Sequence, residues 1–178
     1  WGQQKTHSVE QQLALLGWTG VPVSDRPRTH LAVTPEATAT VNQLLAEAGL
    51  EGRQVALIHP ATAFATKQWA TENFARVAEL LADRGYASVA IGAPNERGTI
   101  EALIDQCSVR IVSFDLSLPE VAALAARSQI FVGNDSGIAH IAAAVGTPSV
   151  VIFGSSNVAH WRSWNKAAAV VVLESMPC

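Results

Sequence analysis

Short apolar runs alternate with segments of helical spacing through most of the chain. The apolar runs predict strands at 55–59, 87–91, 109–113, 130–132, 150–153 and 170–173. The segments between them predict helices at 71–84, 95–106, 117–127 and 136–145. Because the runs are continuously apolar, we expect strands that are covered on both faces. Single helices between strands give right-handed crossovers, so the pattern predicts a doubly wound parallel α/β sheet of about six strands.

The region before the first of these strands is organised differently. Helical spacing over Ser8–Leu16 predicts a helix that stops at Gly17, and a proline-punctuated stretch at 21–28 predicts a linker or edge segment. At Thr34-Pro35-Glu36, a capping hydroxyl, a proline and an acid predict the start of a second helix, which Gly49 ends. In the helix predicted at 71–84, the inward-facing residues are Phe74, Val77, Leu80 and Leu81.

Length and charge narrow the class of protein. A chain of 178 residues fits one domain, and its formal charge of −3 argues against a general nucleic-acid binder. Two cysteines do not make a disulfide framework, which favours a reducing, cytoplasmic compartment. No apolar run approaches the roughly 20 residues of a membrane span. Because the chain begins without Met, we expect it to be part of something longer.

Ligands of doubly wound sheets bind beyond the carboxyl ends of the strands, which directs attention to the loops 59–68, 92–96, 133–137 and 154–157. The first loop combines small and hydroxyl residues with Lys67, just before a predicted helix. A phosphate there would meet free N–H groups, the helix dipole and an ammonium. Neither a Walker A nor a GxGxxG pattern is present, so a plain surface lysine is the alternative interpretation.

The loop after the predicted strand 130–132 reads Gly-Asn-Asp-Ser-Gly and opens an alanine-rich helix. Asp135 or Ser136 is expected to cap that helix, Gly137 leaves room for a ligand, and the side chain of His140 leans back toward the helix start. A capping motif with a half-buried histidine is the alternative interpretation.

The other two loops are less specific. Glu96 either complements the dipole of its helix or accepts the hydroxyls of a ribose, as acids do in dinucleotide folds. The loop 154–157 either contacts a base or sugar or covers the sheet.

Two other chemistries are disfavoured. Adjacent Asp135 and Ser136 diverge along the chain and do not form a triad, and Gly133 stands one residue too far from Ser136 for a nucleophile elbow. The five histidines show no metal-ligand spacing, so we expect no metal site and no cofactor.

Four segments in this order and spacing resemble the C-terminal half of the ADP-heptose:lipopolysaccharide heptosyltransferase family. They are HPATAFATKQW (59–69), GAPNE (92–96), residues 114–128 and FVGNDSGIAHIAAAVGTPSVVIFGSS (131–156). The resemblance implies the donor half of a two-domain GT-B enzyme that inverts the sugar without a metal. Residues 1–30 would then end the interdomain linker, and residues 31–178 would form the nucleotide-sugar domain.

The resemblance also implies roles for residues. Thr62, with Ala63 beside it, and Lys67 would meet the diphosphate, where Lys67 stabilises the leaving group, and Glu96 would hold the ribose. The donor cleft would be lined by Asp135, Ser136, Gly137 and His140. The family often has other small residues at 61–63, and Asp-Thr-Gly is usual where this chain has Asp135-Ser136-Gly137.

The implied partners are an ADP-heptose-like donor and, through an N-terminal domain, a lipid A–core oligosaccharide acceptor. That domain would also carry the general base, an Asp, and the whole protein would be cytoplasmic, with peripheral association at the inner membrane. Two alternatives stay open: a nucleotide-sugar epimerase-like domain, which needs further carboxylates near the donor, and a nucleotide-binding module without catalysis.

Overall fold

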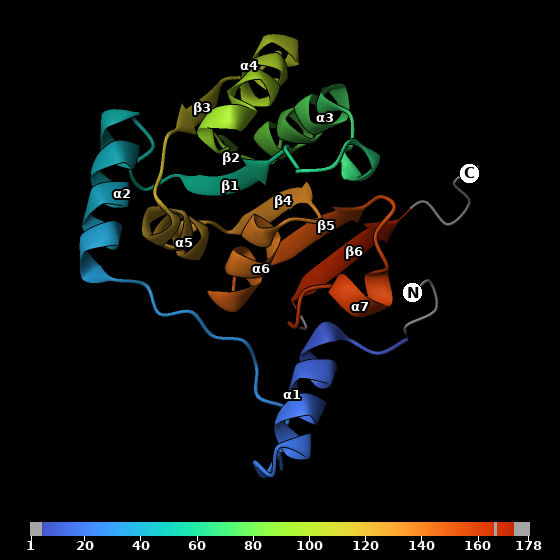
Figure 1. The fold of residues 1–178 in the computed structure, drawn as a ribbon. Helices are drawn as coiled ribbons and strands as arrows, with labels where there is room; N and C mark the ends of the chain where they lie inside the picture. Colours follow the sequence, from blue (N-terminus) through green and yellow to red (C-terminus); the bar gives the residue numbers. More distant parts are fainter. Residues whose placement is uncertain (1–4, 166, 173–178) are drawn as a thin grey trace.

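Six parallel strands form one sheet in the computed structural model, which describes residues 5–165 and 167–172 (Figure 1). The strand order is β3-β2-β1-β4-β5-β6, which confirms the predicted doubly wound parallel sheet. Leu173, the last residue of the predicted final strand, lies outside the described residues. The strands are β1 Gln54–His59, β2 Tyr86–Ile91, β3 Ile111–Phe114, β4 Ile130–Asn134, β5 Ser149–Phe153 and β6 Ala168–Val172.

Helices cover the sheet on both sides. Figure 1 shows α3 (Thr71–Ala82) and α4 (Arg97–Gln106) on one face, with α2 (Pro35–Glu47), α5 (Leu118–Arg127) and α6 (Gly137–Ala144) on the other. Neighbouring strand residues therefore enter different cores: Leu57 packs with α2 and α5, whereas Ile58 packs with Phe74 of α3. This double burial explains the continuously apolar strands. No helix of the described residues is long and apolar enough to cross a membrane.

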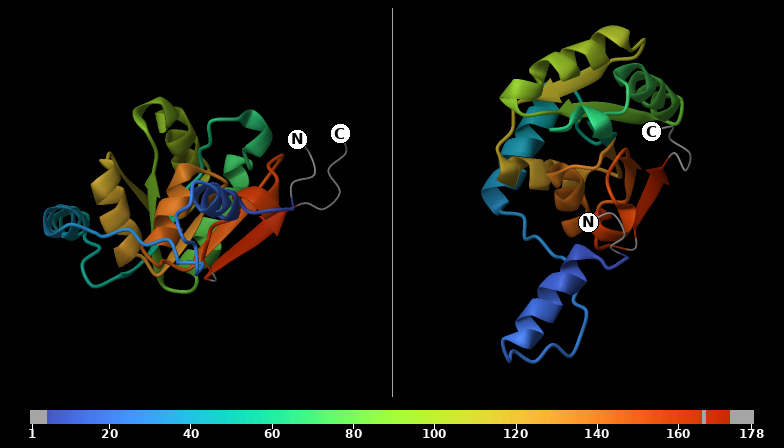
Figure 2. Two further views of the ribbon diagram at one scale, coloured as in Figure 1. Left: turned by 60° about the horizontal axis from the view of Figure 1, so that its bottom comes forward. Right: turned by 45° about the vertical axis from the view of Figure 1, so that its right-hand side comes forward.

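The amino-terminal helix α1 (Ser8–Trp18) stands apart from the sheet and is joined to α2 by an irregular segment (Figure 2). That irregular segment contains the proline-punctuated stretch. As predicted, Thr34 caps the start of α2: its hydroxyl accepts the Ala37 N–H at 3.2 Å, and Gly49 follows the helix with a left-handed φ of 71°. The capping and turn chemistry of this helix is thus local, which is why the sequence reveals it.

Two helix predictions need correction. Helix α1 does not stop at Gly17, because Thr19 closes it: its hydroxyl donates to the Leu16 carbonyl at 2.8 Å, and the left-handed turn falls at Gly20. In α3, Leu80 does not face the core and is 54% exposed, because Phe74, Ala75 and Ala78 form the buried face and leave Leu80 on the outer side.

The position of the crevice in which a ligand could bind follows from the strand order. The chain leaves β1 toward α3 on one face of the sheet and leaves β4 toward α6 on the other. The loops after these adjacent strands therefore diverge and open a crevice at the carboxyl edge of the sheet.

Candidate functional site

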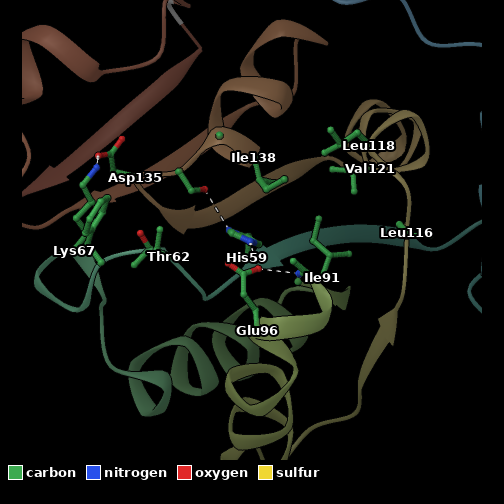
Figure 3. Close-up of a pocket in the computed structure, with 16 residues that line it drawn as sticks. His59, Thr62, Lys67, Ile91, Glu96, Leu116, Leu118, Val121, Asp135 and Ile138 are labelled. Atoms are coloured by element: carbon green, nitrogen blue, oxygen red, sulfur yellow. Dashed lines mark hydrogen bonds and ion pairs between the residues drawn. The ribbon is translucent and has the colours of Figure 1, made fainter.

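A cavity of about 420 Å³ lies in this crevice, beyond the ends of β1, β2 and β4 (Figure 3). Seven of the eight residues predicted from the sequence line it: Thr62, Ala63, Lys67, Glu96, Asp135, Ser136 and Gly137. The eighth, His140, is half-buried and is not among the lining residues. Burial lowers the pKa of His140, while nearby Asp135 opposes that shift. His140 follows the lining residues Gly137 and Ile138 along α6 without being part of the lining.

Lys67 and Asp135 form an ion pair at one end of the cavity. The Lys67 ammonium, on the short 3-10 helix η1 (Ala65–Lys67), donates to the Asp135 carboxylate at 2.8 Å and lies 5.7 Å from the centre of the Phe64 ring. The Asp135 side chain is 6% exposed and that of Lys67 is 25% exposed. One ammonium proton serves Asp135, and the remaining two are available for a ligand oxygen.

Backbone contacts hold the loop that carries Lys67. The buried Asn134 amide donates to the Pro60 carbonyl at 2.7 Å and its oxygen accepts the Trp69 N–H at 3.1 Å, so both ends of the loop are fastened to β4. Gly154, in the loop after β5, packs directly against the backbone of Thr66 and Lys67. The loop 154–157 therefore supports the Lys67 loop and is not part of the cavity lining.

His59, at the end of β1, links Glu96 and Ser136, which line opposite sides of the middle of the cavity. Its Nε2 lies 3.3 Å from the Glu96 carboxylate, and its Nδ1 lies 3.2 Å from the Ser136 hydroxyl. Burial lowers the pKa of His59, and the charge of Glu96 opposes that shift without reversing it. Sequence reasoning did not place His59 in the site, although a histidine ending a buried strand was a signal that pointed there.

Glu96 ends the 3-10 helix η2 (Pro94–Glu96) and faces the cavity. Its carboxylate accepts the Ala93 N–H at 2.8 Å in addition to its contact with His59. These two contacts fix the carboxylate, and its remaining lone pairs are suited to the two hydroxyls of a diol. Glu96 can therefore accept the N–H group at the start of its helix and still bind the hydroxyls of a ligand.

Ser136 occupies the N-cap position of α6 without capping the helix. Its hydroxyl is used by His59, and no side chain of the described residues accepts from the first turn of α6. Asp135 does not cap it either, because its carboxylate is engaged by Lys67. This corrects the predicted cap and leaves N–H groups at the helix start beside the cavity, where an anion is stabilised.

The far end of the cavity is apolar, a feature that the sequence did not reveal. Figure 3 shows Leu116, Leu118 and Val121 at this end, Lys67 and Asp135 at the other, and His59 with Glu96 between them. Along the cavity, a charged end is thus followed by hydrogen-bonding side chains and then by an apolar end. In the part of the chain that the structure describes, no group of three or more His, Cys, Asp or Glu side chains is placed to hold a metal.

The fold and the cavity together define a doubly wound α/β domain with its cleft at the topological switch point, an arrangement typical of nucleotide-binding proteins. The sequence model of glycosyltransferase family 9 (heptosyltransferase) matches residues 2–178. The chain belongs to this family.

Known relatives agree with that assignment. Lipopolysaccharide heptosyltransferase 3 of Escherichia coli is 31% identical over 162 residues, which are 88% of this chain and 47% of the relative. The chain therefore spans about half the length of the curated relatives that it matches.

Solved structures show the same fold. The glycosyl transferase family 9 structure from Veillonella parvula has a TM-score of 0.88 at 22% identity, covering 96% of this chain and 50% of that one. Escherichia coli heptosyltransferase WaaC with ADP has a TM-score of 0.70 at 23% identity, covering 96% and 51%. In fold, 96% of this chain thus corresponds to about half of each of these proteins.

Proposed function

We propose that this chain is the donor-binding half of a heptosyltransferase of lipopolysaccharide core synthesis, and that its cavity binds an ADP-heptose-like nucleotide sugar. In this proposal residues 31–178 form the donor domain and residues 1–30 end the interdomain linker. One observation carries the proposal: the cavity is charged at one end, hydrogen-bonding in the middle and apolar at the other end. That order matches a diphosphate, a ribose and a base.

Each part of the donor meets suitable chemistry. Lys67 and the open start of α6 offer positive charge and N–H groups to the diphosphate. Glu96, held by His59 and Ala93, accepts the ribose hydroxyls. Leu116, Leu118 and Val121 give the base an apolar surface. The heptosyltransferase WaaC structure with ADP, which shares this fold, supports the choice of nucleotide.

The proposed reaction is a single displacement that inverts the sugar and needs no metal. As the sugar–oxygen bond breaks, negative charge grows on the departing ADP, and Lys67 and the α6 N–H groups stabilise that charge. The acceptor, a lipid A–core oligosaccharide, and the general base that deprotonates it would come from the other half of the full-length protein. Transfer therefore needs both halves, whereas donor binding needs this one.

Binding of ADP fragments tests the assignment of the three parts. Calorimetry with ADP, adenosine and pyrophosphate should show that Lys67→Ala weakens ADP and pyrophosphate by roughly tenfold to a hundredfold, the loss of one charge-assisted hydrogen bond. Leu118→Ala should weaken ADP and adenosine by about threefold to tenfold and leave pyrophosphate unchanged. Glu96→Gln should likewise spare pyrophosphate. Arg76→Ala, on the exposed side of α3, is the matched cation control.

Two further results would contradict the proposal. Affinity for ADP that collapses in EDTA and returns with Mg²⁺ would mean that a metal holds the diphosphate. Equal weakening of all three probes by Lys67→Ala would mean that the lysine maintains the loop and does not meet phosphate.

In the full-length protein, Lys67→Ala should reduce kcat more than donor affinity, since leaving-group charge peaks in the transition state.

A further inference from the structure

A second cavity, of about 700 Å³, lies beside the start of the edge strand β6. Its lining comes from the segment that joins α1 to α2, from the loop before β6 and from β6 itself. It shares no residue with the donor cavity, which lies beyond the opposite ends of the strands. The two cavities are therefore separate features of the domain.

Three arginines line this second cavity: Arg26 and Arg28 from the joining segment and Arg162 from the end of the short helix α7 (Val158–Trp161). No acidic residue is among the lining residues. The two ion pairs found among the described residues lie in the donor cavity, and neither involves these guanidinium groups. Among the described residues, the Arg26 side chain donates to the backbone carbonyl of its neighbour Asp25, at 3.3 Å. A local concentration of positive charge thus exists on a chain whose net charge is −3.

Ser163 is a buried polar residue in the wall of this cavity. This residue is 7% exposed, lines the cavity, and its hydroxyl has no hydrogen-bond partner among the described residues. A buried hydroxyl without a partner is unfavourable, and native proteins rarely retain one without a reason. The Ser163 oxygen is itself covered by protein atoms, so its hydroxyl would meet a ligand oxygen after the side chain rotates toward the cavity.

The walls of the cavity are fixed before any ligand enters. The Trp164 indole N–H donates to the Pro27 carbonyl at 2.9 Å, which binds the loop before β6 to the segment carrying Arg26 and Arg28. His7 contacts the Arg162 carbonyl at 2.6 Å and its ring lies 4.5 Å from that of Trp164. These contacts bring the three arginines to one place although they come from distant parts of the sequence.

We propose that this cavity binds the phosphate group of a small organic phosphate monoester. Guanidinium groups match the oxygens of phosphate in bidentate geometry, and the Ser163 hydroxyl, once rotated toward the cavity, donates to a further oxygen. The cavity is larger than an inorganic ion needs and falls in the range of small-molecule sites. The half-buried Trp164 ring and the apolar start of β6 accommodate the organic part.

Calorimetry on the 178-residue chain with glucose 6-phosphate, inorganic phosphate and glucose tests this proposal. Glucose 6-phosphate should bind more tightly than inorganic phosphate, and glucose should not bind measurably. Arg28→Ala and Arg162→Ala should each weaken glucose 6-phosphate by about tenfold or more, as expected for a lost charge-assisted hydrogen bond. Ser163→Ala should weaken it by about threefold to tenfold. The same serine variant should raise the melting temperature of the free chain, because it removes the unpartnered hydroxyl.

Controls separate this site from the donor cavity and from general charge. Lys67→Ala, in the donor cavity, and Arg76→Ala, on an exposed helix face, should leave glucose 6-phosphate affinity unchanged. Equal affinity in wild type and in both arginine variants would overturn the proposal, as would a loss confined to Lys67→Ala. Inorganic phosphate that binds as tightly as glucose 6-phosphate would overturn the part of the proposal that concerns the organic group. Melting temperatures of all variants show whether each one is folded.

Discussion

The Lys67 ammonium and the Asp135 carboxylate meet at 2.8 Å although 68 positions separate them in the sequence. The loop after β1 supplies the lysine and the loop after β4 supplies the acid, so the pair exists only because these two strands are neighbours in the sheet. Asp135 is nearly buried, and its charge is stabilised there by this one cation. The ion pair therefore links the two loops that form the cleft, and it holds the charged groups at this end of the cleft in place.

We expect the pair to be energetically coupled. Lys67→Met should lower the free energy of unfolding by about 1–3 kcal/mol, less than for a fully buried pair because the lysine is 25% exposed. Asp135→Asn removes the charge that Lys67→Met would leave unpaired, so the double variant should lose less than the sum of the single losses. Urea denaturation of the four proteins measures this coupling, expected at about 0.5–2 kcal/mol. Strictly additive losses would show that the two side chains do not stabilise one another.

Gly154 should control the position of Lys67. A Cβ at this glycine would approach the Lys67 Cα to 2.8 Å and would meet the Thr66 carbonyl still more closely, so the loop must move. Gly154→Ala should therefore weaken ADP binding about tenfold or more by displacing the ammonium. Gly98→Ala is the matched control, since a Cβ there meets nothing within 4 Å and α4 should gain about 0.5–1 kcal/mol. Unchanged ADP affinity in Gly154→Ala would mean that the loop adapts without moving Lys67.

Stability should rise between mildly acidic and neutral pH. Burial lowers the pKa of His59 and of His140 below the ordinary value of 6.5. Between the folded-state pKa and 6.5 the unfolded chain binds more protons than the folded chain, so the free energy of unfolding increases with pH. This contribution is complete above pH 6.5 and is lost progressively as the pH falls from 6.5 to the lower pKa values of the folded state.

Urea denaturation at about pH 7.5 and 5.5 measures this difference, at pH values above the titration of most carboxylates. His59→Gln should reduce the difference and leave a remainder that comes from His140. The exposed His30 provides the control, because His30→Gln should leave the difference as it is in the wild type. An identical pH dependence in His59→Gln would exclude His59 as a source of it.

Two glycines near the cleft should give opposite results. A Cβ at Gly133 would lie 2.6 Å from the Phe131 ring and 2.9 Å from the His59 carbonyl, so Gly133→Ala should destabilise the fold by about 1–3 kcal/mol. A Cβ at Gly137 meets nothing within 4 Å, yet this residue lines the cavity. Gly137→Ala should keep the stability and weaken ADP binding. Melting temperature and calorimetry on both variants test this contrast, and a Gly137→Ala protein that binds ADP normally would place the diphosphate away from α6.

The features that could be predicted are those with a local cause. Apolar runs of strand length and helical spacing gave the order of elements, Thr34 and Gly49 marked the ends of α2, and the strand-end rule located the loops of the cavity. Polar residues in those loops were correctly placed together, because parallel strands bring their carboxyl ends to one edge. Their roles toward a ligand stay predictions that the proposed measurements address.

What could not be predicted depends on contacts between distant segments. The use of Ser136 by His59, in place of the helix N–H groups, requires β1 and β4 to be neighbours. The apolar end of the cavity combines residues 116–121 with Ile91, which no local pattern connects. Leu80 is outward because Phe74, Ala75 and Ala78 form the buried face of α3, a choice that helical periodicity alone leaves open. The supporting role of Gly154 is visible only in three dimensions.

The fastening of the Lys67 loop by Asn134 has a kinetic consequence. Because one buried amide holds both ends of this loop, the loop has little conformational freedom to lose when a ligand arrives. Association should then proceed in a single phase whose rate rises linearly with ligand concentration, without the plateau that a slow rearrangement produces. The residence time of the ligand, and not its rate of arrival, should be the quantity that substitutions in the cavity change.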